Sequence, residues 1–206
     1  TRQGQSCTAA SRMLVHESLH DEFVKRLIDK VNSLKMGDPL DEETDIGTII
    51  NRKQFDKVCG YIETGEKEGA TKNELSALPT DSALSDGLFV RPVIFTDVDP
   101  NARVAREEIF GPVACVFKFK TFEEALELAN DSDFGLAATV WTTDLKTALV
   151  ATKRLEAGFV QVNQNLVVQP NLSYGGIKLS GLGKEASLES MLEHFTYKKT
   201  VILNME

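Results

Sequence analysis

A cysteine near the start of the chain stands among residue types that could make its sulfur a nucleophile. Residues 3–10 read QGQSCTAA, with the cysteine at position 7. Gly4 permits a tight bend, Ser6 is a favourable N-cap and two alanines follow, so we expect Cys7 in the first turn of a short helix. Such a helix start would favour the thiolate and could face the oxyanion formed when that thiolate attacks a carbonyl. The alternative is an inert thiol, because cysteine is often a small buried hydrophobe.

A pair of carboxylates forms the second candidate site. Residues 106–113 read REEIFGPV, so Glu107 and Glu108 precede an aromatic residue and a Gly-Pro turn. A carboxylate in a loop can accept both hydroxyls of a ribose, as it does in dinucleotide sites. The alternative is a solvated acidic pair ahead of a buried Phe110 and a turn.

The elements that must position these residues alternate in type along the chain. Apolar runs predict strands at residues 12–16, 88–95, 113–119, 136–141 and 158–163. Helical spacing and capping signals predict helices after a cap at Ser18, over 52–68, after a capping box at 121–124, after Asp144, and over 185–194. Residues 72–87 lack periodicity and predict a surface loop or hairpin. The alternation predicts an α/β fold: a three-layer domain with an open, mostly parallel sheet, helices on both faces and a tail strand at 200–205.

Composition argues against several classes of partner. The 206 residues are 42% hydrophobic and 26% charged, as in ordinary globular proteins, and the net charge of −8 argues against nucleic acid or an anionic membrane. No apolar run approaches the ~20 residues needed to span a bilayer. Three dispersed cysteines are too few for a disulfide framework, which favours the cytoplasm or another reducing compartment. The three histidines have no metal-ligand spacing with them, so no metal site is expected.

Taken together, the two candidate sites closely resemble the signatures of the NAD(P)-dependent aldehyde dehydrogenase family. The segments are GQSC at 4–7 and EEIFGP at 107–112, and the distance between them also fits the family. Similar segments follow as FGLAA at 134–138, AGFVQVN at 157–163 and YGGIKLSG at 174–181. The resemblance therefore covers essentially the whole chain.

The resemblance implies roles for the residues of both sites. Cys7 would be the nucleophile that attacks an aldehyde, giving a thiohemiacetal and then a thioester, with NAD or NADP as the cofactor. Glu108 would bind the nicotinamide ribose. Phe110 and Leu136 would be the apolar contacts that position the nicotinamide.

Two further positions follow from the same resemblance. Lys57, three residues after Gln54, would lie near the adenosine ribose. Tyr174 would stand in the wall of the substrate tunnel, where the family usually has phenylalanine; the alternative is a core aromatic beside a glycine turn. Arg2 departs from the asparagine common in the family, which could alter the loop behind the nucleophile.

The resemblance also implies how the chain is organised. Residues 1–158 would be the catalytic domain, and 159–206 a return segment with an oligomerisation strand. The family's N-terminal dinucleotide-binding domain has no counterpart in these residues. The expected function is that of a catalytic-domain fragment, inactive alone, whose parent oxidises an aldehyde and forms a homo-oligomer. The alternative is a truncated, non-catalytic module, although Cys7 and Glu108 favour a catalytic parent.

Overall fold

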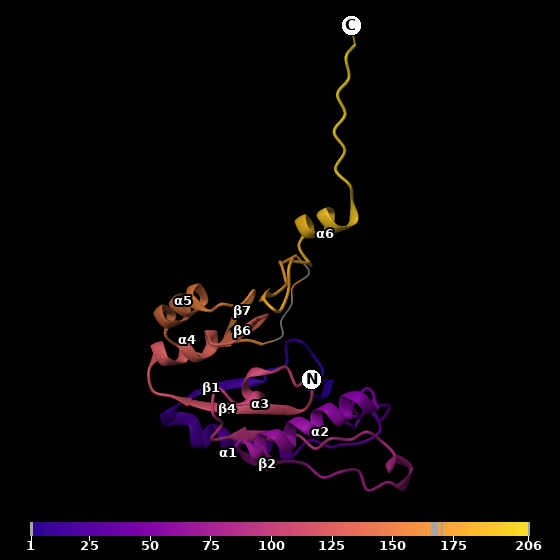
Figure 1. Ribbon diagram of the computed structural model, residues 1–206, viewed down its shortest axis with the longest axis vertical. Coiled ribbons are helices and arrows are strands. Elements are labelled where there is room, and N and C mark those ends of the chain that lie inside the picture. Colours follow the sequence, from indigo (N-terminus) through magenta and orange to yellow (C-terminus); the bar gives the residue numbers. More distant parts are fainter. Residues whose placement is uncertain (1, 166–168, 170, 206) are drawn as a thin grey trace. The chain divides into compact units, whose positions relative to one another are not determined.

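The computed structural model describes residues 2–165, 169 and 171–205, and the chain divides into two compact units. These are Thr1–Ser132 and Asp133–Glu206. Figure 1 traces the elements of each unit in chain order by colour. Of the predicted site residues, the first unit carries Cys7, Lys57, Glu108 and Phe110, and the second carries Leu136 and Tyr174.

A four-stranded sheet forms the centre of the first unit. Its strands, in order across the sheet, are β1 (Arg12–His16), β4 (Val113–Phe119), β3 (Val93–Thr96) and β2 (Thr71–Glu74). β1, β4 and β3 are parallel, whereas β2 is antiparallel to β3. Arg12 pairs with Cys115, and the N–H of Cys115 donates to the carbonyl of Ser11 at 2.8 Å. Because β1 and β4 are parallel neighbours in this register, the segments that lead into them meet at one end of the sheet.

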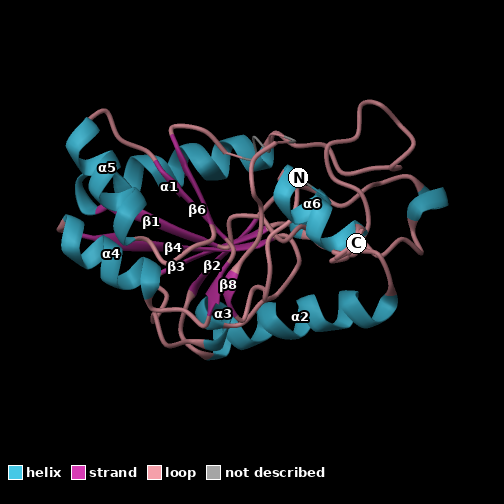
Figure 2. Ribbon diagram, turned by 90° about the horizontal axis from the view of Figure 1, so that it is seen from above, coloured by secondary structure: helices cyan, strands magenta, loops and turns pink. Residues whose placement is uncertain are grey.

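Helices cover both faces of the sheet, which confirms the predicted three-layer α/β fold. On one face, α1 (Glu17–Asn32) packs against Ile94 and Val116. On the other, α2 (Arg52–Lys67) and α3 (Arg103–Arg106) pack against Phe95 and Cys115. Neighbouring residues of one strand thus point into opposite cores, as strand geometry requires. Figure 2 shows the strands between α1 and α2. The remaining elements of this unit are the 3-10 turns η1 (Arg2–Gly4) and η2 (Ser82–Leu84) and the helix α4 (Phe122–Asn130).

The helix starts are largely those that the sequence predicts. The helix expected at 52–68 is confirmed as α2, and Thr121 caps α4 by accepting from the N–H of Glu124 at 3.2 Å. The predicted cap at Ser18 is wrong. The helix α1 begins at Glu17, and Nδ1 of His16 accepts from the N–H of Ser18 at 3.3 Å. The chain therefore passes directly from β1 into α1, with His16 ending the strand and capping the helix.

The segment predicted to be a surface loop or hairpin at 72–87 contains part of an edge strand, which pairs antiparallel with the next strand as a hairpin does. β2 (Thr71–Glu74) pairs with β3 along its whole length, and Nδ2 of Asn73 donates to the carbonyl of Ile94 at 3.1 Å. Its sequence, TKNE, has no apolar alternation. Backbone pairing with β3 and the polar contact of Asn73, rather than apolar side chains of this segment, hold it in the sheet, which is why its pattern did not reveal it.

The second unit contains a β-α-β element, as predicted. β6 (Ala137–Val140) and β7 (Phe159–Val162) are parallel and are joined through α5 (Leu145–Arg154). Oδ2 of Asp144 caps α5 by accepting from the N–H of Thr147 at 2.7 Å. A second, antiparallel pair consists of β5 (Phe134–Gly135) and β8 (Ile177–Lys178). The helix α6 (Leu188–Phe195) follows.

The predicted tail strand is wrong. Residues 200–205 lie within the described part of the chain and adopt no strand there. A strand needs a neighbour that pairs with its backbone, and apolar composition alone cannot supply one. The large apolar side chains exposed in the tail and on α6 are those of Leu188, Met191, Leu192, Phe195, Val201, Ile202, Leu203 and Met205. None of the helices in the described ranges has both the length and the apolar character that crossing a membrane requires.

Two glycines of α2 provide a matched test of packing against the sheet. A Cβ on buried Gly65 would lie 2.6 Å from Cζ of Phe95, whereas a Cβ on exposed Gly60 would have no described atom within 4 Å. Alanine gains about 1 kcal/mol of helix propensity at either position. We expect Gly60→Ala to stabilise the protein by about that amount, and Gly65→Ala to destabilise it by roughly 1–3 kcal/mol through overpacking. Urea unfolding measures both changes, and equal stability of the two variants would contradict this packing.

Candidate functional site

Cys7 lies on an exposed turn that leads into β1. The turn is closed by a hydrogen bond from the N–H of Ala9 to the carbonyl of Ser6 at 3.0 Å. The predicted short helix is therefore wrong, and with it the helix-dipole argument for a thiolate. The reason is geometric: β1 begins at Arg12, so the chain must become extended before a helix can form.

A glycine brings this turn against the second motif. Gly4 has a φ of +71°, and a Cβ on it would lie 2.0 Å from the carbonyl oxygen of Gly111. A side chain at position 4 would therefore collide with backbone, which cannot move aside as a flexible side chain could. This contact places the backbone three residues before Cys7 directly against the loop that carries the carboxylate pair.

The helix α2 supports the same loop from its other side. A Cβ on Gly111 would lie 2.5 Å from Cγ2 of Val58, a fully buried residue of α2. Oε1 of Gln5 accepts from the N–H of Ile50 at 2.9 Å, just ahead of this helix. Three segments that are distant in sequence thus meet: the cysteine turn, the start of α2 and the loop before β4.

Phe110, the predicted nicotinamide contact, has an uncommon backbone conformation. Its φ is +58°, in the left-handed region that residues with a Cβ rarely adopt. Nε2 of Gln54 donates to the carbonyls of Ile109 and Phe110, at 2.9 Å each. Sequence reasoning gave Gln54 no role; its place one turn before Lys57 on the same helix was the available signal. Gln54 is therefore one of the residues that hold this loop conformation.

The two adjacent carboxylates have different environments. Glu107 accepts from Nε and Nη2 of Arg103 at 2.8 and 2.9 Å, and from the Tyr61 hydroxyl at 2.5 Å. These hydrogen bonds, that from Arg103 first, lower the pKa of Glu107 to about 2. Glu108 is exposed, and among the described residues no hydrogen bond to its side chain is found. The Glu108 carboxylate is therefore the more accessible of the two to a ligand, and its ribose-binding role stays a prediction, whereas Glu107 is engaged by Arg103 and Tyr61.

Lys57 lies beside Glu108 in this arrangement. Its Nζ donates to the carbonyl oxygen of Glu108 at 2.8 Å and lies 5.7 Å from the centre of the Tyr61 ring. The family resemblance implies that this lysine lies near an adenosine ribose, and that role stays a prediction. The contact seen here is with the protein's own backbone.

The two predicted residues of the second unit both lie beside Phe159. Leu136 connects β5 to β6, and its carbonyl accepts from the N–H of Phe159 at 2.9 Å. The ring of Tyr174 meets the Phe159 ring edge to face, with 5.4 Å between their centres. Tyr174 also exchanges two backbone hydrogen bonds with Glu185, and Nζ of Lys184 donates to the carbonyl of Gly175 at 2.6 Å. Leu136 and Tyr174 thus belong to one cluster, in which the backbone around Tyr174 is fixed.

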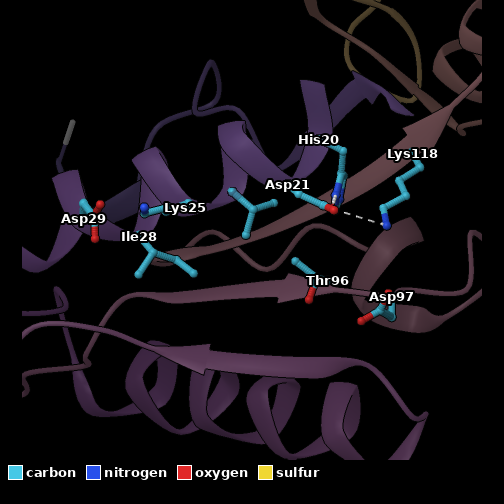
Figure 3. A pocket seen from close by; sticks show the side chains of 9 residues that line it. His20, Asp21, Lys25, Ile28, Asp29, Thr96, Asp97 and Lys118 are labelled. Carbon is cyan, nitrogen blue, oxygen red and sulfur yellow. Dashed lines mark hydrogen bonds and ion pairs between the residues drawn. The ribbon is translucent and has the colours of Figure 1, made fainter. Parts of the chain in front are cut away.

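A hollow on the α1 face contains none of the predicted site residues. Figure 3 shows His20 and Asp21 of α1 near Lys118 of β4, with Asp21 3.5 Å from the Lys118 ammonium. The hollow is lined by three aspartates and two lysines, namely Asp21, Asp29, Asp97, Lys25 and Lys118. This mixture of charges favours neither anions nor cations. The candidate site remains the region where the cysteine turn meets the loop before β4.

The family model and the relatives that match this chain indicate the same family. The family model described as "Aldehyde dehydrogenase family" matches residues 1–201. Retinaldehyde dehydrogenase 3 of Mus musculus is 44% identical over 205 residues, covering 99% of this chain and 39% of that protein. Betaine aldehyde dehydrogenase of Brucella anthropi is 40% identical over 202 residues, covering 98% of this chain and 41% of that protein.

Solved structures agree with this result. A crystal structure of betaine aldehyde dehydrogenase from Staphylococcus aureus in complex with NAD+ has a TM-score of 0.87 and 37% identity, covering 93% of this chain and 38% of that one. The chain thus spans about two fifths of the length of the relatives it matches.

The environments of the three cysteines predict an order of alkylation. Cys7 is exposed, whereas burial raises the pKa of the half-buried Cys59 and raises that of the buried Cys115 to about 12. Because the thiolate is the reactive form, iodoacetamide should modify Cys7 first, Cys59 more slowly and Cys115 only on unfolding. Peptide mapping over time measures the order, with the protein in urea as the control. Earlier modification of Cys59 or Cys115 in the folded protein would contradict it.

The ion pair of Glu107 predicts an acid-dependent contribution to stability. The folded pKa of about 2 lies below the ordinary 4.5, so the contribution is present above pH 4.5 and is lost as the pH falls toward 2. The Glu107 side chain is 42% exposed, which limits the effect to about 1 kcal/mol or less. In urea unfolding, Glu107→Gln should therefore have a lower free energy of unfolding than the wild type at neutral pH, and the difference should be much smaller at pH 3. Glu63→Gln, which removes an exposed pair with Lys67, is the matched control. A pH-independent difference would overturn this assignment.

Proposed function

The chain belongs to the aldehyde dehydrogenase family, and we propose that it is the catalytic portion of an NAD(P)-dependent enzyme that oxidises an aldehyde to a carboxylic acid. The observation that carries the proposal is the contact of Gly4 with Gly111, which sets the Cys7 turn against the loop of Glu108. A nucleophile and a ribose-binding carboxylate must be close neighbours if one dinucleotide is to serve both.

The proposed chemistry at Cys7 is covalent catalysis. The thiolate attacks the aldehyde carbon, the carbonyl electron pair moves to oxygen, and a thiohemiacetal forms on sulfur. The chemistry that NAD or NADP supplies, when bound, is acceptance of the hydride. Cys7 then holds the acyl group as a thioester, which water cleaves to release the carboxylic acid and return the thiol. A thiolate suits both steps because it is a soft nucleophile and a good leaving group.

The cofactor would be held by residues whose environments fit this task. The exposed Glu108 carboxylate has room for the two hydroxyls of a ribose, and its backbone is fixed by Lys57. Phe110 is half-buried and fixed by Gln54, so its ring can bound one side of the nicotinamide. Leu136 is proposed as a nicotinamide contact on the family resemblance alone.

The remaining assignments concern the substrate side and the whole protein. Tyr174 is proposed as part of the substrate-tunnel wall. Residues 1–158 are proposed as the catalytic domain and 159–206 as the returning segment, with the dinucleotide fold supplied, as the family resemblance implies, by a portion outside these residues. The exposed apolar side chains of α6 and the tail favour association, and we propose a homo-oligomer in a reducing compartment.

Replacement of the nucleophile tests the proposed chemistry in the complete enzyme. We expect Cys7→Ser to lower aldehyde-dependent formation of reduced dinucleotide by at least about a thousandfold, because a serine hydroxyl is a far weaker nucleophile. Cys59→Ser, at a half-buried position of α2, is the matched control and should retain activity. Residues 1–206 alone should show no turnover. Activity that survives Cys7→Ser would sink the mechanism.

A further inference from the structure

One face of α2 makes an unusual series of polar contacts with residues 103–108. Lys57 and Tyr61 lie four residues apart on this face, and Glu68, the C-cap residue that directly follows α2, stands seven residues after Tyr61 on the same side. Each of them binds a different part of the segment: a carbonyl, a carboxylate and a backbone N–H. The segment ends at Glu108, the proposed ligand of the ribose.

The contacts converge on Glu107. Arg103 binds both oxygens of its carboxylate, and the Tyr61 hydroxyl donates to one of them at 2.5 Å. A bidentate guanidinium and a third donor leave a carboxylate little freedom to rotate. The Arg103 guanidinium also lies 5.6 Å from the centre of the Tyr61 ring, so the three side chains form one connected group.

The same group fastens the short helix α3 to α2. The N–H of Arg103 donates to Oε2 of Glu68 at 3.0 Å, and the N-cap residue of α3, Ala102, makes no side-chain cap. Glu68 of the neighbouring helix thus replaces a local cap. As a result, Glu107 is fixed both through its own side chain and through the helix that precedes it.

Stability alone does not explain this arrangement. The side chains of Arg103 and Glu107 are 58% and 42% exposed, and ion pairs at such positions contribute little to folding. The effect of these contacts on the geometry of the neighbouring Glu108 is larger. With Glu107 fixed and the Glu108 carbonyl held by Lys57 at 2.8 Å, the backbone of Glu108 is restrained on both sides of its Cα.

We propose that Tyr61, Arg103 and Glu107 form a positioning clamp that sets the affinity of the enzyme for its dinucleotide by orienting Glu108. The clamp residues do not touch the dinucleotide and act only through the Glu108 backbone. Because the clamp is formed in advance, the carboxylate loses little freedom when it accepts the ribose hydroxyls. This proposal rests on the proposed function, in which Glu108 is the ribose ligand.

The experiment measures dinucleotide binding to the complete enzyme. The variants are Tyr61→Phe and Glu107→Gln, with Glu108→Ala as the reference and Glu63→Gln as the matched control on the same helix. Equilibrium titration with NAD+ or NADP+ gives Kd, and steady-state kinetics give KM for the aldehyde. We expect both clamp variants to raise the dinucleotide Kd by about fivefold to tenfold, with the aldehyde KM unchanged. Loss of folded protein alone would lower the number of binding sites and leave Kd unchanged.

A double variant tests whether the clamp acts through Glu108. If it does, adding Tyr61→Phe to Glu108→Ala should raise Kd no further. Additive effects of the two substitutions, or a Tyr61→Phe enzyme that binds like the wild type while Glu108→Ala binds weakly, would overturn the clamp and leave the proposed function standing. A wild-type Kd in Glu108→Ala would instead refute the ribose assignment on which the clamp depends.

Discussion

The arrangement of the first unit depends on a contact between two backbone segments, at Gly4 and Gly111, that leaves no room for a side chain. Gly4 and Gly111 are more than one hundred residues apart in sequence, yet a Cβ on Gly4 would lie 2.0 Å from the Gly111 carbonyl oxygen. The parallel pairing of β1 with β4 makes this approach possible, because both leading segments reach the sheet at the same end. The positive φ of Gly4 completes it. The proximity of the cysteine turn to the carboxylate loop is therefore a property of the sheet's register, refined by one glycine.

The helix α2 gives this meeting point its shape through apolar packing and through hydrogen bonds made from the same side of the helix. Val58 and Gly65 pack against Gly111 and Phe95 and anchor the helix on the sheet. Gln54 and Lys57, which lie beside them on that side, donate hydrogen bonds to the carbonyls of the loop. Packing fixes the position of α2 on the sheet, and the hydrogen bonds from Gln54 and Lys57 then fix the position of the loop relative to α2. A core position and a site position on one rigid helix cannot move independently.

The sequence predicts the layers well because apolar periodicity reports burial directly. β4 reads as a strand from its composition, and the caps at Thr121 and Asp144 are local signals that the structure retains. Prediction from sequence fails where contacts with other elements determine the local structure. β2 is held by the backbone of β3, and His16 replaces Ser18 as a cap because β1 ends there. The predicted helix at Cys7 and the predicted strand at 200–205 are wrong for the same reason: local propensity indicates a helix or a strand, but the surrounding structure determines which element forms.

The adjacent glutamates show most clearly what sequence cannot resolve. Glu107 and Glu108 are adjacent and have the same side-chain chemistry, and the only local signal that separates them is Arg103, four residues before Glu107. The difference comes from α2 and α3, which engage Glu107 through Tyr61 and Arg103 and leave the Glu108 carboxylate exposed. A carboxylate that already accepts three hydrogen bonds from the protein has less capacity left for the two hydroxyls of a ribose than its exposed neighbour. The two residues therefore have different roles. Tyr61 and Arg103 hold Glu107 rigidly, and the same contacts at Glu108 would occupy the carboxylate that is proposed to bind the ribose.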